Sequence, residues 1–197
     1  HGRWLEREIE RKRVAIEGAT HLIAISDATA RELEYFYPGV RGRVTTVYLC
    51  ADHLSVRPEP VSPAPPGPYV LYVGDRHLYK NFSAVLEAME SPRWPGAVDL
   101  CVAGPPWRAN EALRVERLST TRRIHHAGRV SDGQLAGLYR GAACVVVPAI
   151  AEGFGLPLIE AQQAGVPVVC SDIAVFREVA GAGALYFDPH RAKQLAE

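Results

Sequence analysis

The strongest constraint in this sequence is an alternation of six short apolar runs with stretches of helical periodicity. The runs are rich in Val, Ile, Leu and Ala without polar alternation, which is typical of strands buried on both faces of a sheet. We expect strands at 69–73, 98–103, 124–127, 144–147, 167–170 and 184–187. The helices between them are expected at 81–90, 110–119, 132–140, 156–164 and 175–179. This pattern predicts an α/β fold with a doubly wound, Rossmann-like parallel sheet.

The beginning of the chain predicts a smaller α/β unit. A helix over 4–18 precedes a strand at 22–25, a helix that ends near Phe36, and a second strand at 44–49. A strand–helix–strand unit normally pairs its strands in parallel. Residues 1–50 are therefore expected to form a partial second α/β domain.

A proline-rich segment separates the two predicted units. Six prolines fall between residues 58 and 68, and proline fits neither a helix interior nor a central strand. We therefore predict a linker over 51–68, followed by a domain over 69–197. A long surface loop is the alternative.

The charges of the chain balance, because 22 Lys and Arg residues match 22 Asp and Glu residues. Nucleic acids and anionic membranes usually select a basic face, so this balance argues against either as the main partner. Basic and acidic residues alternate in the first helix, which favours a solvated face over a membrane contact. The four cysteines lack zinc-ribbon or redox spacing, which favours free thiols in a reducing compartment such as the cytoplasm.

The loop after the fourth predicted strand carries the strongest functional signal, since ligands of such sheets bind beyond the carboxyl ends of the strands. Gly153 and Gly155 remove side chains where a backbone turns or meets a ligand closely. The proline after Leu156 suits a first helical turn, whose main-chain N–H groups can bind phosphate. Glu152 and Glu160 would repel phosphate, so we expect them to accept hydrogen bonds from sugar and ribose hydroxyls. An ordinary helix start with acidic residues near its positive dipole end is the alternative.

Two weaker signals follow the first and third predicted strands. Gly74 opens a loop with Arg76 and Lys80, two cations that could hold a diphosphate and stabilise it as a leaving group. Solvated surface charge is the alternative. The backbone around Arg129 and Val130 could border a nucleobase, a pattern that is weak by itself.

Together these residues resemble retaining glycosyltransferases of the GT-B fold, the large family that includes bacterial mannosyl- and glucosyltransferases of polysaccharide assembly. The most specific likeness is the pair Glu152 and Glu160, with seven residues between them around Gly-Phe-Gly-Leu-Pro. Further likenesses are Lys80-Asn81 and the segments 128–131 and 165–169. The resemblance implies that the larger domain is the carboxy-terminal, nucleotide-sugar-binding domain and that the smaller unit is the end of the amino-terminal, acceptor-side domain.

The resemblance also implies roles for individual residues. Among the catalytic residues, Glu152 would hold hydroxyls of the donor sugar, while Arg76 and Lys80 would bind the diphosphate and stabilise the departing nucleotide. Glu160 would bind the ribose. The other donor contacts would come from Gly74, from Arg129 and Val130 beside the base, and from the backbone of Gly153, Phe154, Gly155 and Leu156. No metal or other cofactor is expected, because the cations replace it.

The implied reaction moves a hexose from a nucleotide-diphosphate sugar to a hydroxyl of a sugar, lipid-linked or small-molecule acceptor, with retention. It would serve polysaccharide, glycolipid or natural-product glycosylation, in the cytoplasm or at the inner face of the membrane. Many relatives have an arginine where this chain has Asp75, and here the arginine, Arg76, follows one position later. Most of the family's amino-terminal domain has no counterpart here. We therefore expect the isolated chain to bind donor without transferring it, and another chain to carry the missing domain.

Two other functions fit the same pattern. A sugar-nucleotide epimerase of this fold would bind a similar donor but act without an acceptor. A non-catalytic nucleotide-sugar-binding fragment would work with a partner chain. A dehydrogenase is rejected, because the one near fingerprint, Gly181-Ala182-Gly183, precedes a strand instead of following it. The absence of Gly-Lys-Ser/Thr excludes a P-loop enzyme.

Overall fold

A computed structural model describes residues 2–196, and the chain divides into two compact units, residues 1–49 and 50–197. This division falls one residue before the end of the smaller domain that the sequence predicts. Each unit is described below by itself.

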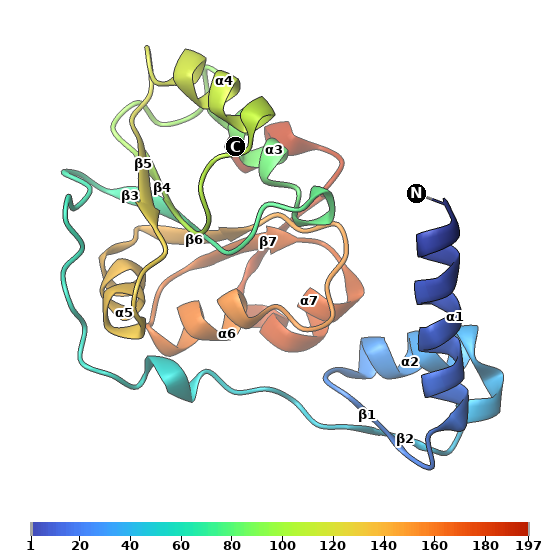
Figure 1. Cartoon of the computed structure of the whole chain (residues 1–197). Coiled ribbons are helices and arrows are strands. Elements are labelled where there is room, and N and C mark those ends of the chain that lie inside the picture. Colours follow the sequence, from blue (N-terminus) through green and yellow to red (C-terminus); the bar gives the residue numbers. More distant parts are fainter. Residues whose placement is uncertain (1, 197) are drawn as a thin grey trace. The chain divides into compact units, whose positions relative to one another are not determined.

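The first unit is a parallel strand–helix–strand preceded by a helix (Figure 1). Its elements are α1 (Gly2–Gly18), β1 (Leu22–Ala24), α2 (Asp27–Phe36) and β2 (Val44–Thr46). The two strands pair in parallel along their length, as the sequence predicts, although β2 is three residues shorter than expected. The buried Ser26 begins α2, because its hydroxyl oxygen accepts the N–H of Thr29 at 3.0 Å.

The second unit contains a six-stranded sheet in the order β5-β4-β3-β6-β7-β8, with all neighbours parallel. The strands are β3 (Tyr69–Val73), β4 (Asp99–Ala103), β5 (Ile124–Gly128), β6 (Cys144–Val147), β7 (Val168–Ser171) and β8 (Leu185–Phe187). Each predicted strand is present, with ends shifted by one residue at most. The predicted parallel sheet is therefore confirmed.

Helices cover both faces of this sheet (Figure 1). The helices are α3 (Phe82–Glu90), α4 (Ala109–Leu118), α5 (Asp132–Gly141), α6 (Leu156–Gln163) and α7 (Ala174–Ala180). Figure 1 shows α3 and α4 on one face and α5, α6 and α7 on the other. The doubly wound architecture follows from this arrangement.

The core forms where apolar helix faces meet the sheet. All five residues of β4 are buried. α3 turns Phe82, Val85, Leu86 and Met89 inward, each at most 3% exposed, at the spacing of a single helical face. Full burial of such a side chain contributes about 1.5–3 kcal/mol, so the helices are held to the sheet mainly by these contacts.

The winding direction changes between β3 and β6. From β3 the chain winds outward through β4 to β5, then returns to place β6 on the other side of β3. The loops after β3 and β6 therefore emerge side by side at the carboxyl edge of the sheet, the position where such folds bind ligands.

The beginning of the predicted linker, residues 51–59, packs on α5. The Glu59 N–H donates to the Gly133 carbonyl at 2.8 Å. A Cβ at Gly137 would lie 2.2 Å from the Glu59 carbonyl oxygen, so only glycine permits this approach. The buried Leu54 belongs to a short 3-10 turn in the same segment. Residues 51–59 thus pack against the rest of the second unit.

Near the end of the described residues the chain forms a 3-10 helix at Ala192–Ala196, which contacts α3. Among residues 2–196, none of the helices has the length and apolar character that a membrane span requires. Cys101 and Cys170 are buried free thiols, and Cys50 is exposed.

Candidate active site at the sheet edge

The loops after β3 and β6 are joined at the point where the winding reverses. The Ile150 N–H donates to the Tyr79 carbonyl at 2.8 Å, which ties the two backbones together. Lys80 Nζ forms an ion pair with Glu152 Oε2, and the two side chains are 27% and 19% exposed. The cation expected to hold a diphosphate and the carboxylate expected to hold a sugar therefore meet in one place, open to solvent.

A tight turn positions Lys80. It ends the 3-10 helix Leu78–Lys80, and Asn81 follows in the left-handed region with φ 52°. Asparagine tolerates this conformation better than most residues. The Asn81 side-chain amide also donates to the Pro189 carbonyl at 3.0 Å, which fixes the turn to the end of the chain.

The glycine-rich turn leads directly into α6. Gly155 caps α6 with φ 96°, and a Cβ there would lie 2.7 Å from the Phe176 ring. Glycine is therefore required both by conformation and by space. Leu156 opens the helix, while Phe154 is buried at 3% exposure. The Gly153 N–H lies 3.3 Å from Glu152 Oε1 as a donor.

Glu160 lies within α6 and is only 5% exposed. The Tyr139 hydroxyl on α5 donates to its Oε2 at 2.5 Å, and His53 Nε2 lies 3.0 Å from its Oε1. A carboxylate only accepts hydrogen bonds, so Nε2 carries the proton. Both partners of Glu160 were missed by sequence reasoning.

The structure does not bring Arg76 to Lys80 and Glu152. Its side chain is buried, and Nε donates to Glu111 Oε2 at 2.9 Å. Nη2 donates to the carbonyls of two prolines after β4 at 2.7 and 2.6 Å, and the guanidinium lies over the Trp107 ring at 4.7 Å. With these partners, the Arg76 guanidinium is not available to a diphosphate in this conformation.

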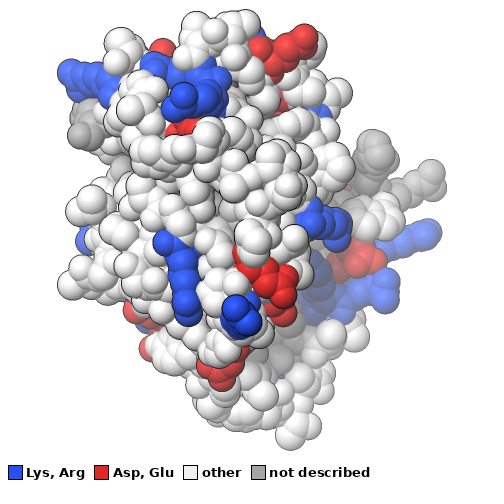
Figure 2. All heavy atoms as spheres, turned by 90° about the vertical axis from the view of Figure 1, so that its left-hand side faces the viewer, with Lys and Arg blue, Asp and Glu red and all other residues white. Residues whose placement is uncertain are grey.

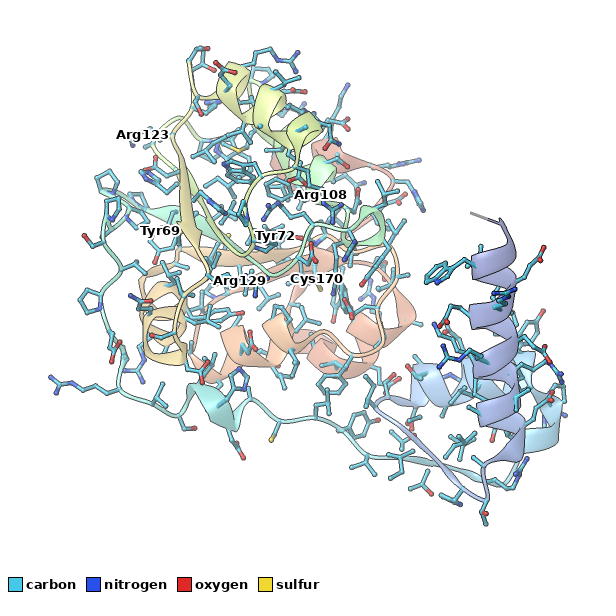
Figure 3. The ribbon with its side chains drawn as sticks, viewed as in Figure 1. Tyr69, Tyr72, Arg108, Arg123, Arg129 and Cys170 are labelled. Atoms are coloured by element: carbon cyan, nitrogen blue, oxygen red, sulfur yellow. The ribbon has the colours of Figure 1, made fainter. Side chains whose placement is uncertain are left out.

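The residues expected near a nucleobase lie further along the same edge. Figure 3 shows Arg123 and Arg129 at opposite ends of β5, and Arg129 is exposed at the carboxyl end. Val130 is partly buried. β4 separates β5 from β3, so Arg129 and Val130 can meet only a ligand that extends across the edge.

Gly74 lies at the carboxyl end of β3 with φ 117°, and its N–H donates to the Ala103 carbonyl at 2.9 Å. A Cβ at the next loop's Gly104 would lie 2.4 Å from the Gly74 carbonyl oxygen. The loops after β3 and β4 therefore approach each other closely at Gly74 and Gly104, where no side chains lie between the two backbones.

Charges on the second unit follow the balance of the composition. Figure 2 shows basic and acidic side chains interspersed on one face. Within residues 2–196, no group of three or more His, Cys, Asp or Glu side chains is arranged to hold a metal ion.

Residues 59–197 match the family model of glycosyl transferases group 1. The chain belongs to this family. Among curated relatives, the O-antigen chain mannosyltransferase B of Escherichia coli is 31% identical over 209 residues, which cover 95% of this chain and 52% of that protein. The serotype-specific mannosyltransferase WbdA of Escherichia coli is 43% identical over 136 residues, or 66% of this chain and 16% of that protein.

Solved structures support the same fold assignment. Sucrose-phosphate synthase from Thermosynechococcus elongatus superposes with a TM-score of 0.76 and 25% identity, over 97% of this chain and 51% of that chain. This group 1 chain thus spans about half the length of the O-antigen mannosyltransferase and of the synthase. The predicted GT-B relationship is confirmed.

Proposed function

We propose that this chain is the donor-binding half of a hexosyltransferase that moves a hexose from a nucleoside-diphosphate sugar to an acceptor hydroxyl with retention. The observation that carries the proposal is the meeting of Lys80 with Glu152 at the reversal between β3 and β6. Family membership supports the reaction class.

In the proposed mechanism, the bound diphosphate replaces Glu152 as the partner of Lys80. Glu152 then accepts hydrogen bonds from hydroxyls of the sugar, and the amides between Gly153 and Leu156 surround the sugar and the phosphate. The bond from the sugar C1 to the phosphate oxygen breaks, and a bond from C1 to the acceptor oxygen forms on the same face. The acceptor proton passes to the departing phosphate oxygen.

Lys80 stabilises the negative charge that grows on the leaving diphosphate, so no metal ion or other cofactor is required in this proposal. Arg129 and Val130 flank the base, and Glu160 holds the ribose. Arg76 acts at a distance, because its buried ion pair with Glu111 shapes the loop that carries Lys80.

The relatives named as mannosyltransferases make mannose the first donor sugar to test. Because the chain spans about half of such a relative, we propose that these residues bind the donor and that sugar transfer also needs an acceptor-side domain. The acceptor would be a sugar, a lipid-linked sugar or a small molecule, met in the cytoplasm or at the inner membrane face.

A thermal-shift screen with GDP, UDP, ADP and dTDP tests the binding claim. A ligand that binds only the folded form stabilises it by about 2.7 kcal/mol at one hundred times its Kd. We expect one of these nucleotides to raise the melting temperature, while none doing so would refute donor binding. Product analysis in the presence of the acceptor-side domain, with and without an acceptor, separates transfer from epimerisation.

A further inference from the structure

Glu160 differs from the other glutamates of the site in its partners. Glu152 and Glu111 each form an ion pair with a basic side chain, Lys80 and Arg76 respectively. Glu160 is instead held by a tyrosine hydroxyl and a histidine, one on each oxygen. Its negative charge is therefore held in place without being paired to a lysine or arginine in these contacts.

The acceptor capacity of this carboxylate fits a pair of hydroxyls. A carboxylate has about four lone-pair sites, two on each oxygen. Tyr139 takes one site on Oε2 and His53 takes one on Oε1. One site remains on each oxygen, which is what two adjacent hydroxyls of one sugar ring require.

The two donors come from different surroundings. Tyr139 is fully buried, and burial together with the charge of Glu160 raises the pKa of its hydroxyl well above the ordinary value. The hydroxyl therefore stays protonated and always donates. The His53 side chain is 38% exposed, so it stands at the rim where Glu160 meets solvent.

The segment that carries His53 is held against the same helices. Its 3-10 turn Asp52–Leu54 contacts α5, and Figure 1 shows the segment running beside α5 and α6. The Gln163 side chain on α6 donates to the Ser55 hydroxyl at 2.9 Å. His53 precedes residue 59, where the family match begins.

We propose that Tyr139 and His53 are positioning residues that fix the Glu160 carboxylate to receive the vicinal hydroxyls of the donor's ribose. The proposal rests on the proposed function, because it assumes that Glu160 binds the ribose. It adds a residue outside the family match to the nucleotide site.

Titration calorimetry of the whole chain with GDP and UDP, and with their 2′,3′-dideoxy forms, tests the proposal. Tyr139→Phe and His53→Ala should each weaken binding of the ribose form about tenfold, the cost of one lost hydrogen bond to a charged group. Binding of the dideoxy form should change little. His53→Gln, which keeps a donor, should recover most of the affinity.

Tyr69→Phe is the matched control, because it removes another buried tyrosine hydroxyl, one that donates to the Leu138 carbonyl at 2.7 Å. It should leave binding of both forms unchanged. If Tyr139→Phe does not fold, the exposed His53 variants carry the test.

Equal losses for the ribose and dideoxy forms would reduce Tyr139 and His53 to structural residues and overturn the proposal. Unchanged ribose binding in both variants would also overturn it while leaving the proposed function intact. A wild-type chain that binds none of the four nucleotides of the thermal-shift screen would refute the proposed function, and the proposal with it.

Discussion

Replacing Glu111 with Ala is expected to lower the free energy of unfolding by about 3–5 kcal/mol, the usual cost of removing one partner of a buried ion pair. The Arg76 side chain is 1% exposed and that of Glu111 is 10% exposed, so the remaining guanidinium cannot turn to water. Its Nη1 already lacks a hydrogen-bond partner among the described residues. Glu111 also accepts the Arg108 N–H at 2.9 Å, so the start of α4 is weakened too.

Urea unfolding followed by the fluorescence of Trp94 and Trp107 measures this loss in the second unit. The matched control is Glu90→Ala. Like Glu111, Glu90 forms ion pairs with arginine, in this case Arg114 and Arg117, but its side chain is 36% exposed. That variant should cost about 1 kcal/mol or less.

A loss in Glu111→Ala no larger than in Glu90→Ala would refute the buried pair. It would mean that the Arg76 guanidinium reaches solvent, where it could bind a diphosphate after all. The double variant Arg76→Met/Glu111→Ala should be more stable than Glu111→Ala, because it leaves no buried charge unpaired.

Three further predictions concern other parts of the second unit. Lys80→Ala, assayed together with the acceptor-side domain, should lower turnover about 100-fold through lost charge stabilisation of the leaving group. Gly155→Ala should lower the free energy of unfolding by roughly 2–5 kcal/mol, from the left-handed φ and the clash with Phe176. Burial raises the pKa of the Cys101 and Cys170 thiols from the ordinary value of 9.0 to about 12. At alkaline pH the folded chain therefore keeps thiol protons that the unfolded chain loses. Stability to urea should therefore be steady below about pH 9 and fall as pH rises toward 12.

Each of these predictions has a contradicting outcome. Turnover of Lys80→Ala within about twofold of wild type would remove Lys80 from the transition state, since a preorganised charge is worth far more. Gly165→Ala is the control for Gly155→Ala, because Gly165 has φ 72° with nothing near its Cβ; equal losses would contradict the clash. A urea concentration at the unfolding midpoint that stays constant from neutral pH to about pH 11 would contradict the thiol linkage.

The fold could be predicted because its signal is local and repeated. The four inner strands of the second unit, β3, β4, β6 and β7, are short runs that are mostly apolar and buried. Burial on both faces removes the alternation that would have signalled a one-sided sheet. The sequence also predicted that the loops carrying Lys80 and Glu152 lie at the carboxyl edge of the sheet. It did not predict that β6 lies beside β3, because the order of elements along the chain does not fix the order of strands in the sheet.

Side-chain partners distant in the sequence could not be predicted in this way. Arg76 turns inward because Glu111, 35 residues later, faces it. Glu160 meets His53 across 107 residues. Gly133 and Gly137 are the one local sequence signal that the proline-rich segment packs on α5. The same two glycines could equally indicate that this stretch forms a helix poorly.

Donor binding at the sheet edge can be measured by titration calorimetry of the wild-type chain, Lys80→Ala and Glu160→Ala with the nucleotide selected by the thermal-shift screen. We expect saturable binding at one site by the wild type and a loss of at least about tenfold in affinity for each variant, the equivalent of one charged hydrogen bond. Affinity that is unchanged in both variants would place the nucleotide elsewhere and refute a donor site at Lys80 and Glu160.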